Sequence, residues 1–311
     1  NKQLKYTASN SFWDSNIQVP YYDEKELNER QLPESIIKYP YLTVSDFLEP
    51  VIFELDYKLN YKAFYNPDKD NNKDISYALP LTKRFFDFFT IQDLMNKNSN
   101  GESMLEINSY SSSVDVILRV PINKGKDIIT FTRRYESKEN SFESNLTPDL
   151  KNNKGVIERL DAAVAVYPFI QSQNVNEYRI GLYKVKDYDI NLIYFNKNNK
   201  SINIIDTKQR GEDNVKSSYD LVENQFEYIT VNYFGYSNSI IPIWKKQNAA
   251  NEKFTFAVDF GTTNTHIEYQ IGNSLAKPFE INEKDIQFES TISSKSTKGG
   301  TPLFISRSIE L

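Results

Sequence analysis

The sequence contains no cysteine and only one histidine, His266, among its 311 residues. Without cysteine, the chain can form neither disulfide bonds nor thiolate zinc sites. A single histidine leaves no histidine cluster for a metal and no catalytic triad, and we expect His266 to be a strand-surface residue. No run of about 20 apolar residues occurs, so no membrane span is predicted. We expect a cytoplasmic protein, a setting in which disulfide bonds are rare.

Charge of one sign is also scarce, since the formal net charge is only −5. No strongly basic segment stands out, so nucleic-acid binding is not favoured. Aromatic residues are abundant instead, with 21 tyrosines and 20 phenylalanines, and this favours β-rich structure. The many asparagines and lysines are typical of AT-rich bacterial genomes.

Alternating apolar and polar residues predict a series of strands that are separated by turns rich in Asn, Gly and Lys. The predicted strands cover residues 51–57, 114–120, 127–135, 163–170, 177–185, 190–195, 201–206, 226–234 and 240–244. This spacing is typical of an antiparallel sandwich or barrel-like sheet. We therefore predict a β-rich domain over residues 1–248, with short helices near its start.

The predicted helices are short. Residues 23–39 carry charges at helical spacing, residues 43–48 look like an N-capped turn, and residues 90–97 look like a capped helix. The segment 79–89 contains four phenylalanines. We favour a core helix there over an exposed docking stripe.

The most informative segment is 254–269, which has the pattern of strand, tight turn and strand. Its first half alternates from Phe254 to Phe260, and Gly261 follows. The turn continues with Thr262, Thr263 and Asn264, whose backbone N–H groups and hydroxyls can converge on an anion. Asp259 stands at the strand end, where a carboxylate suits a phosphate only through a hydrated Mg²⁺.

Residues 257–265 resemble the first phosphate motif of the actin-like ATPase superfamily, which includes heat-shock chaperones, sugar kinases and actins. The resemblance covers residues 254–281 and is closest to the chaperone-like branch. It implies that Asp259 holds the Mg²⁺ shell and that Gly261, Thr262, Thr263 and Asn264 hold the β- and γ-phosphates. ATP and Mg²⁺ would be the cofactors of the complete protein. The implied fold is ribonuclease-H-like, with this hairpin as its opening.

The predicted fold class is therefore α+β and β-rich, with residues 254–311 as the incomplete start of an actin-like ATPase domain. The family's second phosphate motif and its adenosine-binding Gly-Gly lie much further downstream. Gly299 and Gly300 come too early and fall in a predicted flexible loop. We expect that this chain alone binds no nucleotide.

Several alternatives stay open from the sequence. The chain can instead be a non-enzymatic binding or scaffolding module that recognises a protein, peptide or sugar through its β-rich domain. Arg133 and Arg134 can contact an anion, although a solvated strand end is the favoured interpretation. Asp206 and Lys208 faintly resemble a nuclease pair, but no acidic partner supports them. A kinase is less favoured than an ATPase, because nothing supplies a sugar or acid pocket.

Overall fold

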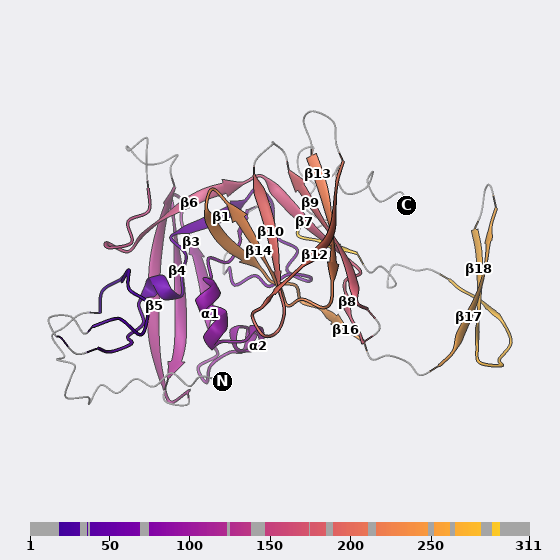
Figure 1. Ribbon diagram of the computed structural model, residues 1–311, viewed down its shortest axis with the longest axis horizontal. Helices are drawn as coiled ribbons and strands as arrows, with labels where there is room; N and C mark the ends of the chain where they lie inside the picture. Colours follow the sequence, from indigo (N-terminus) through magenta and orange to yellow (C-terminus); the bar gives the residue numbers. More distant parts are fainter. Residues whose placement is uncertain are drawn as a thin grey trace.

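The computed structural model describes residues 19–31, 36, 38–68, 75–122, 125–137, 147–173, 175–184, 189–210, 216–247, 252–261, 265–280 and 288–292. Strands make up 54% of the structure and helices 7%, which confirms the β-rich class, and one sheet curls into a half-barrel. Figure 1 shows the sheets grouped in one body, with the β17–β18 hairpin lying apart from them. No helix in these ranges is long and apolar enough to cross a membrane.

The first sheet has six strands in the order β2-β1-β6-β5-β4-β3. Its strands are β1 (Val51–Leu55), β2 (Ser76–Tyr77), β3 (Leu105–Ser109), β4 (Ser113–Ile122), β5 (Asp127–Ser137) and β6 (Lys154–Leu160). β6 runs parallel to both β1 and β5, whereas the other neighbours are antiparallel. The sheet is therefore mixed, which differs from the purely antiparallel arrangement that the turn spacing predicted.

Three further sheets of the described residues belong to the body. The five-stranded sheet has the order β12-β13-β9-β7-β20, the four-stranded sheet has the order β11-β10-β14-β15, and β16 pairs with β8. The strands are β7 (Ala162–Tyr167), β8 (Ile170–Gln171), β9 (Glu177–Lys184), β10 (Ile190–Phe195), β11 (Ser201–Ile202), β12 (Ile204–Arg210), β13 (Lys216–Glu223), β14 (Tyr228–Tyr233), β15 (Tyr236–Ile240), β16 (Lys245–Lys246) and β20 (Glu289–Ser290).

A buried side chain joins the four-stranded sheet to the first one. Asn238 of β15 accepts a hydrogen bond from the Phe53 N–H at 2.9 Å and donates one to the Val51 carbonyl at 2.9 Å. These are the two contacts that a neighbouring backbone would make with β1. Because Asn238 is fully buried, its amide satisfies strand groups that water cannot reach. The Asn238 side chain therefore links β15 of the four-stranded sheet to β1 of the first sheet.

The helices are the 3₁₀ turn η1 (Val44–Asp46), α1 (Lys83–Phe88) and α2 (Ile91–Met95). Thr43 forms a capping box with Asp46 on η1 and Thr90 forms one with Asp93 on α2, so the two predicted caps are confirmed. Thr82 caps α1, which was not predicted. Phe85 of α1 is fully buried and the phenylalanines beside it pack on the same hydrophobic cluster. The core interpretation of residues 79–89 is thus confirmed.

Hydrophobic side chains form two clusters. One cluster lies beneath the helices and the first sheet and includes Phe47, Phe85 and Leu118. The other draws on β1 and on strands of the five-stranded and four-stranded sheets, and it includes Phe53, Tyr178 and Phe226. Both clusters draw residues from strands that are far apart in sequence, so the body folds through long-range contacts.

Some local predictions were wrong. The described part of residues 23–39 contains turns and a Gln31–Lys38 bridge but no helix. The Arg30 side chain reaches the Lys25 and Tyr41 carbonyls, so tertiary contacts override the helical charge spacing. The predicted strand 201–206 divides into β11 and β12, and residues 241–244 do not form a strand.

The last sheet contains β17 (Phe254–Phe260), β18 (Thr265–Ile271) and β19 (Lys277–Pro278) in that order. Within the described ranges these strands pair only with one another. The chain then returns to the body, because β20 pairs with β7 and the Thr291 hydroxyl lies 2.7 Å from the Tyr57 hydroxyl. The β-rich body therefore receives a strand from beyond the boundary expected at residue 248.

Candidate functional site

The predicted phosphate site lies at the turn of the β17–β18 hairpin. Asp259 is the last residue but one of β17, and its Cα pairs with that of His266 on β18. Gly261 directly follows the strand and is exposed. Thr262, Thr263 and Asn264 lie outside the described residues. The two predicted strands are confirmed and pair antiparallel, while the phosphate and Mg²⁺ roles stay predictions.

The register of the hairpin separates its residues into two faces, because directly opposed side chains lie on the same side of a sheet. One face is polar and contains Thr255, Ala257 and Asp259, opposed by Gln270, Glu268 and His266. The other is apolar and contains Phe254, Phe256 and Val258, opposed by Ile271, Tyr269 and Ile267. The hairpin is therefore amphipathic, with Asp259 at the turn end of its polar face.

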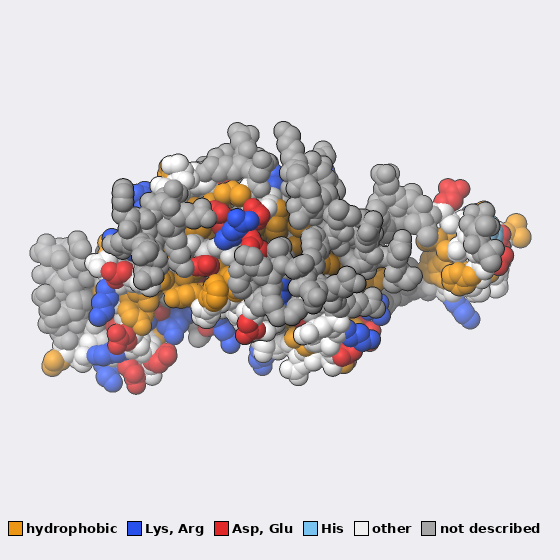
Figure 2. All heavy atoms as spheres, turned by 90° about the horizontal axis from the view of Figure 1, so that it is seen from above, with side chains coloured by type: hydrophobic (Ala, Val, Ile, Leu, Met, Phe, Trp, Pro, Cys, Tyr) orange, Lys and Arg blue, Asp and Glu red, His pale blue; other side chains and the backbone are white. Residues whose placement is uncertain are grey.

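The apolar face has no layer over it in the described structure. Phe256 is 53% exposed and Phe260 is 82% exposed, and every residue of β17 is classed as exposed. Figure 2 shows hydrophobic side chains in orange on the surface of the hairpin at the right-hand end of the molecule. Among the described residues, the Phe256 ring lies near rings of its own small sheet and of the residue after it, at centroid distances of 6.2 Å from Phe254, 6.4 Å from Tyr269 and 5.9 Å from Phe279. A contiguous exposed apolar face of this kind is typical of a surface that contacts a partner.

The polar face offers a carboxylate beside the turn. Among the described residues, no hydrogen bond or ion pair engages the Asp259 carboxylate. The neighbouring His266 Nε2 lies 3.2 Å from Glu268 Oε1, so these two side chains interact with each other. An exposed carboxylate at a strand end can contact a hydrated Mg²⁺ through water. The described residues contain no group of three or more potential metal ligands.

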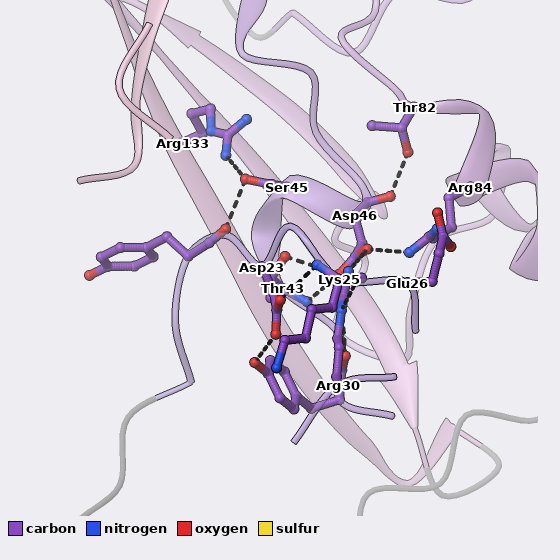
Figure 3. Close-up of polar contacts among 12 residues, drawn as sticks. Asp23, Lys25, Glu26, Arg30, Thr43, Ser45, Asp46, Thr82, Arg84 and Arg133 are labelled. Atoms are coloured by element: carbon purple, nitrogen blue, oxygen red, sulfur yellow. Dashed lines mark hydrogen bonds and ion pairs between the residues drawn. The ribbon is translucent and has the colours of Figure 1, made fainter. Parts of the chain in front are cut away.

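A second cluster of charges lies around η1 (Figure 3), and Arg30 and Asp46 at its centre are buried. Asp46 receives two hydrogen bonds from Arg30, at 2.6 and 2.8 Å, and one from Arg84 at 2.7 Å. The backbone N–H of Thr43 donates a further bond at 2.7 Å. Burial by itself raises the pKa of Asp46, but the hydrogen bonds from Arg30 and Thr43 outweigh burial and leave this pKa below its ordinary value. Because the carboxylate is enclosed and fully bonded, it joins segments of the fold and offers no open ligand position.

The interpretation of Arg133 as part of a solvated strand end was wrong. Arg133 is fully buried, and it donates to the Leu48 carbonyl at 2.6 Å, to Ser45 Oγ at 2.5 Å and to Asn153 Oδ1 at 3.0 Å. Burial lowers the pKa of this guanidinium. Arg133 therefore ties η1 to β5 and is not accessible to an external anion.

The remaining predicted sites are surface pairs. Arg134 forms a two-pronged ion pair with Asp115, at 2.7 and 2.8 Å, on the exposed side of the first sheet. Asp206 and Lys208 lie on β12, 3.9 Å apart and both exposed. Neither pair has the enclosure or the convergent groups of a catalytic site.

Sequence reasoning missed the role of Asp46, although the signal was present. The Thr43-x-x-Asp46 spacing predicts a capping box, and it forms. The arginines that complete the cluster come from distant segments, so the sequence spacing gives no hint of them. Comparisons of the chain with protein-family models, with curated proteins and with solved structures found no match.

Proposed function

We propose that the β17–β18 hairpin is the phosphate-binding edge of an actin-like, chaperone-like ATP-binding domain. The domain would be completed by polypeptide outside the described residues. The strongest support is the amphipathic character of the hairpin. Its polar face has Asp259 near the turn, and no described residue from another element covers its apolar face. A strand built to be buried on one side belongs to a layered domain.

The residues fit the proposed cofactors in part. The Asp259 carboxylate would hold a hydrated Mg²⁺, and the turn from Gly261 to Asn264 would receive the phosphates through its backbone N–H groups. Bound Mg²⁺ would neutralise phosphate charge, which is the main requirement of phosphoryl transfer. The proposed role of the whole protein is an ATP- and Mg²⁺-dependent conformational ATPase in the cytoplasm, with no nucleotide held by the present chain alone.

A second candidate is a non-enzymatic β-rich binding or scaffolding module. It is favoured by the pairing of β16 with β8 and of β20 with β7, which ties the hairpin to the body on both sides. In this candidate the hairpin is an insertion, and its apolar face contacts a partner protein without any nucleotide. The two candidates share the need for a covering layer and differ in the role of the turn.

The test is the Mg²⁺-ATP affinity of the full-length protein that carries Asp259→Ala together with Thr262→Val. We expect the affinity to fall at least about tenfold, because the change removes the Mg²⁺ contact and a phosphate donor. Calorimetric titration with and without Mg²⁺ measures this directly. Glu268→Ala is the matched control, since its carboxylate lies on the same face but further from the turn.

The outcomes separate the two candidates. Unchanged Mg²⁺-ATP affinity in the double variant would exclude the proposed site. Absence of any nucleotide binding by the full-length protein, together with a protein partner that loses affinity on Phe256→Ser, would favour the binding module. An equal loss of Mg²⁺-ATP affinity in Glu268→Ala would show that nucleotide binding depends on the polar face as a whole rather than on the turn.

A further inference from the structure

The small sheet of β17, β18 and β19 has two edges that differ in sequence. Within the described residues, β17 and β19 each pair only with β18, so both are edge strands. β19 consists of Lys277 and Pro278, two residue types that protect a sheet edge from further pairing. β17 contains neither lysine nor proline, and all of its residues are exposed. Its outer edge is therefore suited to accept a further strand.

The register of the hairpin determines which backbone groups point to this edge. The Gly272 N–H donates to the Lys253 carbonyl at 2.8 Å, so these opposed residues form a hydrogen-bonded pair. Such pairs alternate with non-hydrogen-bonded pairs along an antiparallel ladder. On the other side of β18, the Phe279 N–H donates to the Ile267 carbonyl at 2.8 Å, which agrees with this alternation. The residues of β17 whose N–H and C=O groups point to the outer edge are therefore Phe254, Phe256, Val258 and Phe260.

The β17 strand is complementary to a second copy of itself. When two copies run antiparallel with Ala257 opposite Ala257, every residue with outward backbone groups meets another such residue. Phe254 then lies opposite Phe260 of the second copy, and Phe256 lies opposite Val258. Aromatic pairs, and pairs of an aromatic with a β-branched residue, are among the cross-strand contacts that stabilise a sheet.

The charges of the strand are compatible with this register. Asp259 is the only charged residue of β17, and it lies opposite Thr255 of the second copy. Lys253, which precedes the strand, lies opposite Gly261 of the second copy. No like charges face one another, and the apolar side chains of both copies stay on the same side of the joined sheet.

We propose that the β17–β18 hairpin is an arm through which two copies of this chain pair edge to edge along β17. Two three-stranded sheets then join into one six-stranded sheet, and a small sheet gains stability from added strands. Figure 1 shows the hairpin apart from the sheets of the body, as such an arm requires. Lys245 Nζ lies 3.3 Å from Glu289 Oε1, so the segments before and after the arm meet at the body. The pairing leaves the turn and both faces of the hairpin open, and it does not depend on the proposed phosphate site.

Disulfide cross-linking tests the pairing, since the chain has no cysteine of its own. In the proposed register the two Ala257 Cα atoms form a non-hydrogen-bonded pair about 4.5 Å apart, a distance that a disulfide spans. Ala257→Cys in the intact chain should therefore give a covalent dimer under mild oxidation. Glu268→Cys is the matched control, because Glu268 lies opposite Ala257 on the same face. Its two copies would lie three strand spacings apart, about 14 Å, and should not cross-link.

Sedimentation velocity over a range of concentrations measures the pairing without a cross-link. Val258→Pro should weaken dimerisation at least about tenfold, because it removes an outward N–H and leaves the ladder with β18 intact. Thr255→Asp should weaken dimerisation about fivefold, because it faces Asp259 of the second copy. Thr255→Lys should not weaken it. Both substitutions keep the neutral Gln270 as their neighbour within the hairpin, so the comparison isolates the contact between copies.

The proposal is overturned if the intact chain stays monomeric up to millimolar concentration, or if Ala257→Cys and Glu268→Cys cross-link equally. Equal dimer affinities of the Thr255→Asp and Thr255→Lys variants would contradict the register and overturn it as well. A full-length protein that stays monomeric while the 311-residue chain dimerises would assign the β17 edge to a strand of the same polypeptide, and this result would also overturn it.

Discussion

β4 and β17 have the same alternating pattern in sequence, but their apolar faces are in different surroundings. In β4 the residues Val114, Val116, Leu118 and Val120 are all buried, and they pack into the cluster beneath the helices. In β17 the residues Phe254, Phe256, Val258 and Phe260 are all exposed. Alternation shows that one face of a strand is apolar, and it does not show which element covers that face.

The difference has an energetic meaning. Burying a large apolar side chain contributes about 1.5–3 kcal/mol relative to leaving it in water. β4 gains this contribution and β17 does not, within the described structure. A hairpin in water is marginal by itself, and three strands need a packed face for independent stability. The hairpin therefore gains most from a covering layer, whereas the body is already packed.

Replacing one phenylalanine in each region tests the comparison most strongly. Phe47→Ala should lower the free energy of unfolding by about 3–5 kcal/mol, because its ring is fully buried among other aromatic rings. Phe256→Ala should change the unfolding of the body by no more than about 0.5 kcal/mol. Urea denaturation of the two variants measures both values. Similar losses would mean that the hairpin is packed into the body after all.

Removal of a buried carboxylate should cause the next largest loss of stability. Asp46→Ala should cost about 3 kcal/mol, because it leaves the buried Arg30 guanidinium without its partner. Asp115→Ala removes the partner of an exposed arginine and should cost less than about 1 kcal/mol. Thermal unfolding of the two variants gives the ranking. An Asp115→Ala variant as unstable as Asp46→Ala would contradict the distinction between buried and exposed pairs.

Substitution of a glycine in the first sheet should cause a smaller loss of stability. A Cβ at Gly155 would lie 2.4 Å from Tyr135 Cδ1, and the Tyr135 hydroxyl is held by a 2.7 Å bond to the Glu49 carbonyl. Gly155→Ala should therefore destabilise the body by about 1–3 kcal/mol through overpacking. The double variant with Tyr135→Leu should lose less than the sum of the single losses, since the clash is then relieved. Additive losses would show that the close approach is unimportant.

Much of the body was predictable, because its strands carry a clean period of two. Strands β4, β5 and β10 were predicted close to their observed bounds, as was the capped helix after Thr90. Strand β6 was missed because its buried and exposed residues do not alternate regularly. Strand β13 was missed because it contains few apolar residues. Arg133 was misjudged because its partners are Ser45 on η1, Leu48 just after η1 and Asn153 just before β6, and these partners lie about 20 to 88 residues away in sequence.

The candidate site was predictable only in its local part. The strand, the turn position and the location of Asp259 follow from residues 254–269, since they depend on neighbours in sequence. The exposure of the apolar face and the return of the chain through β20 depend on long-range pairing, which a local pattern does not contain.

Thiol labelling of the hairpin tests the central claim most directly, and the absence of cysteine from this sequence makes it practicable. Phe256→Cys places a thiol on the apolar face, and Glu268→Cys places one on the polar face. In the 311-residue chain both thiols should react rapidly with a maleimide. In the full-length protein we expect Phe256→Cys to be protected, with Glu268→Cys still reactive. Equal and rapid labelling of both positions in the full-length protein would contradict a covering layer.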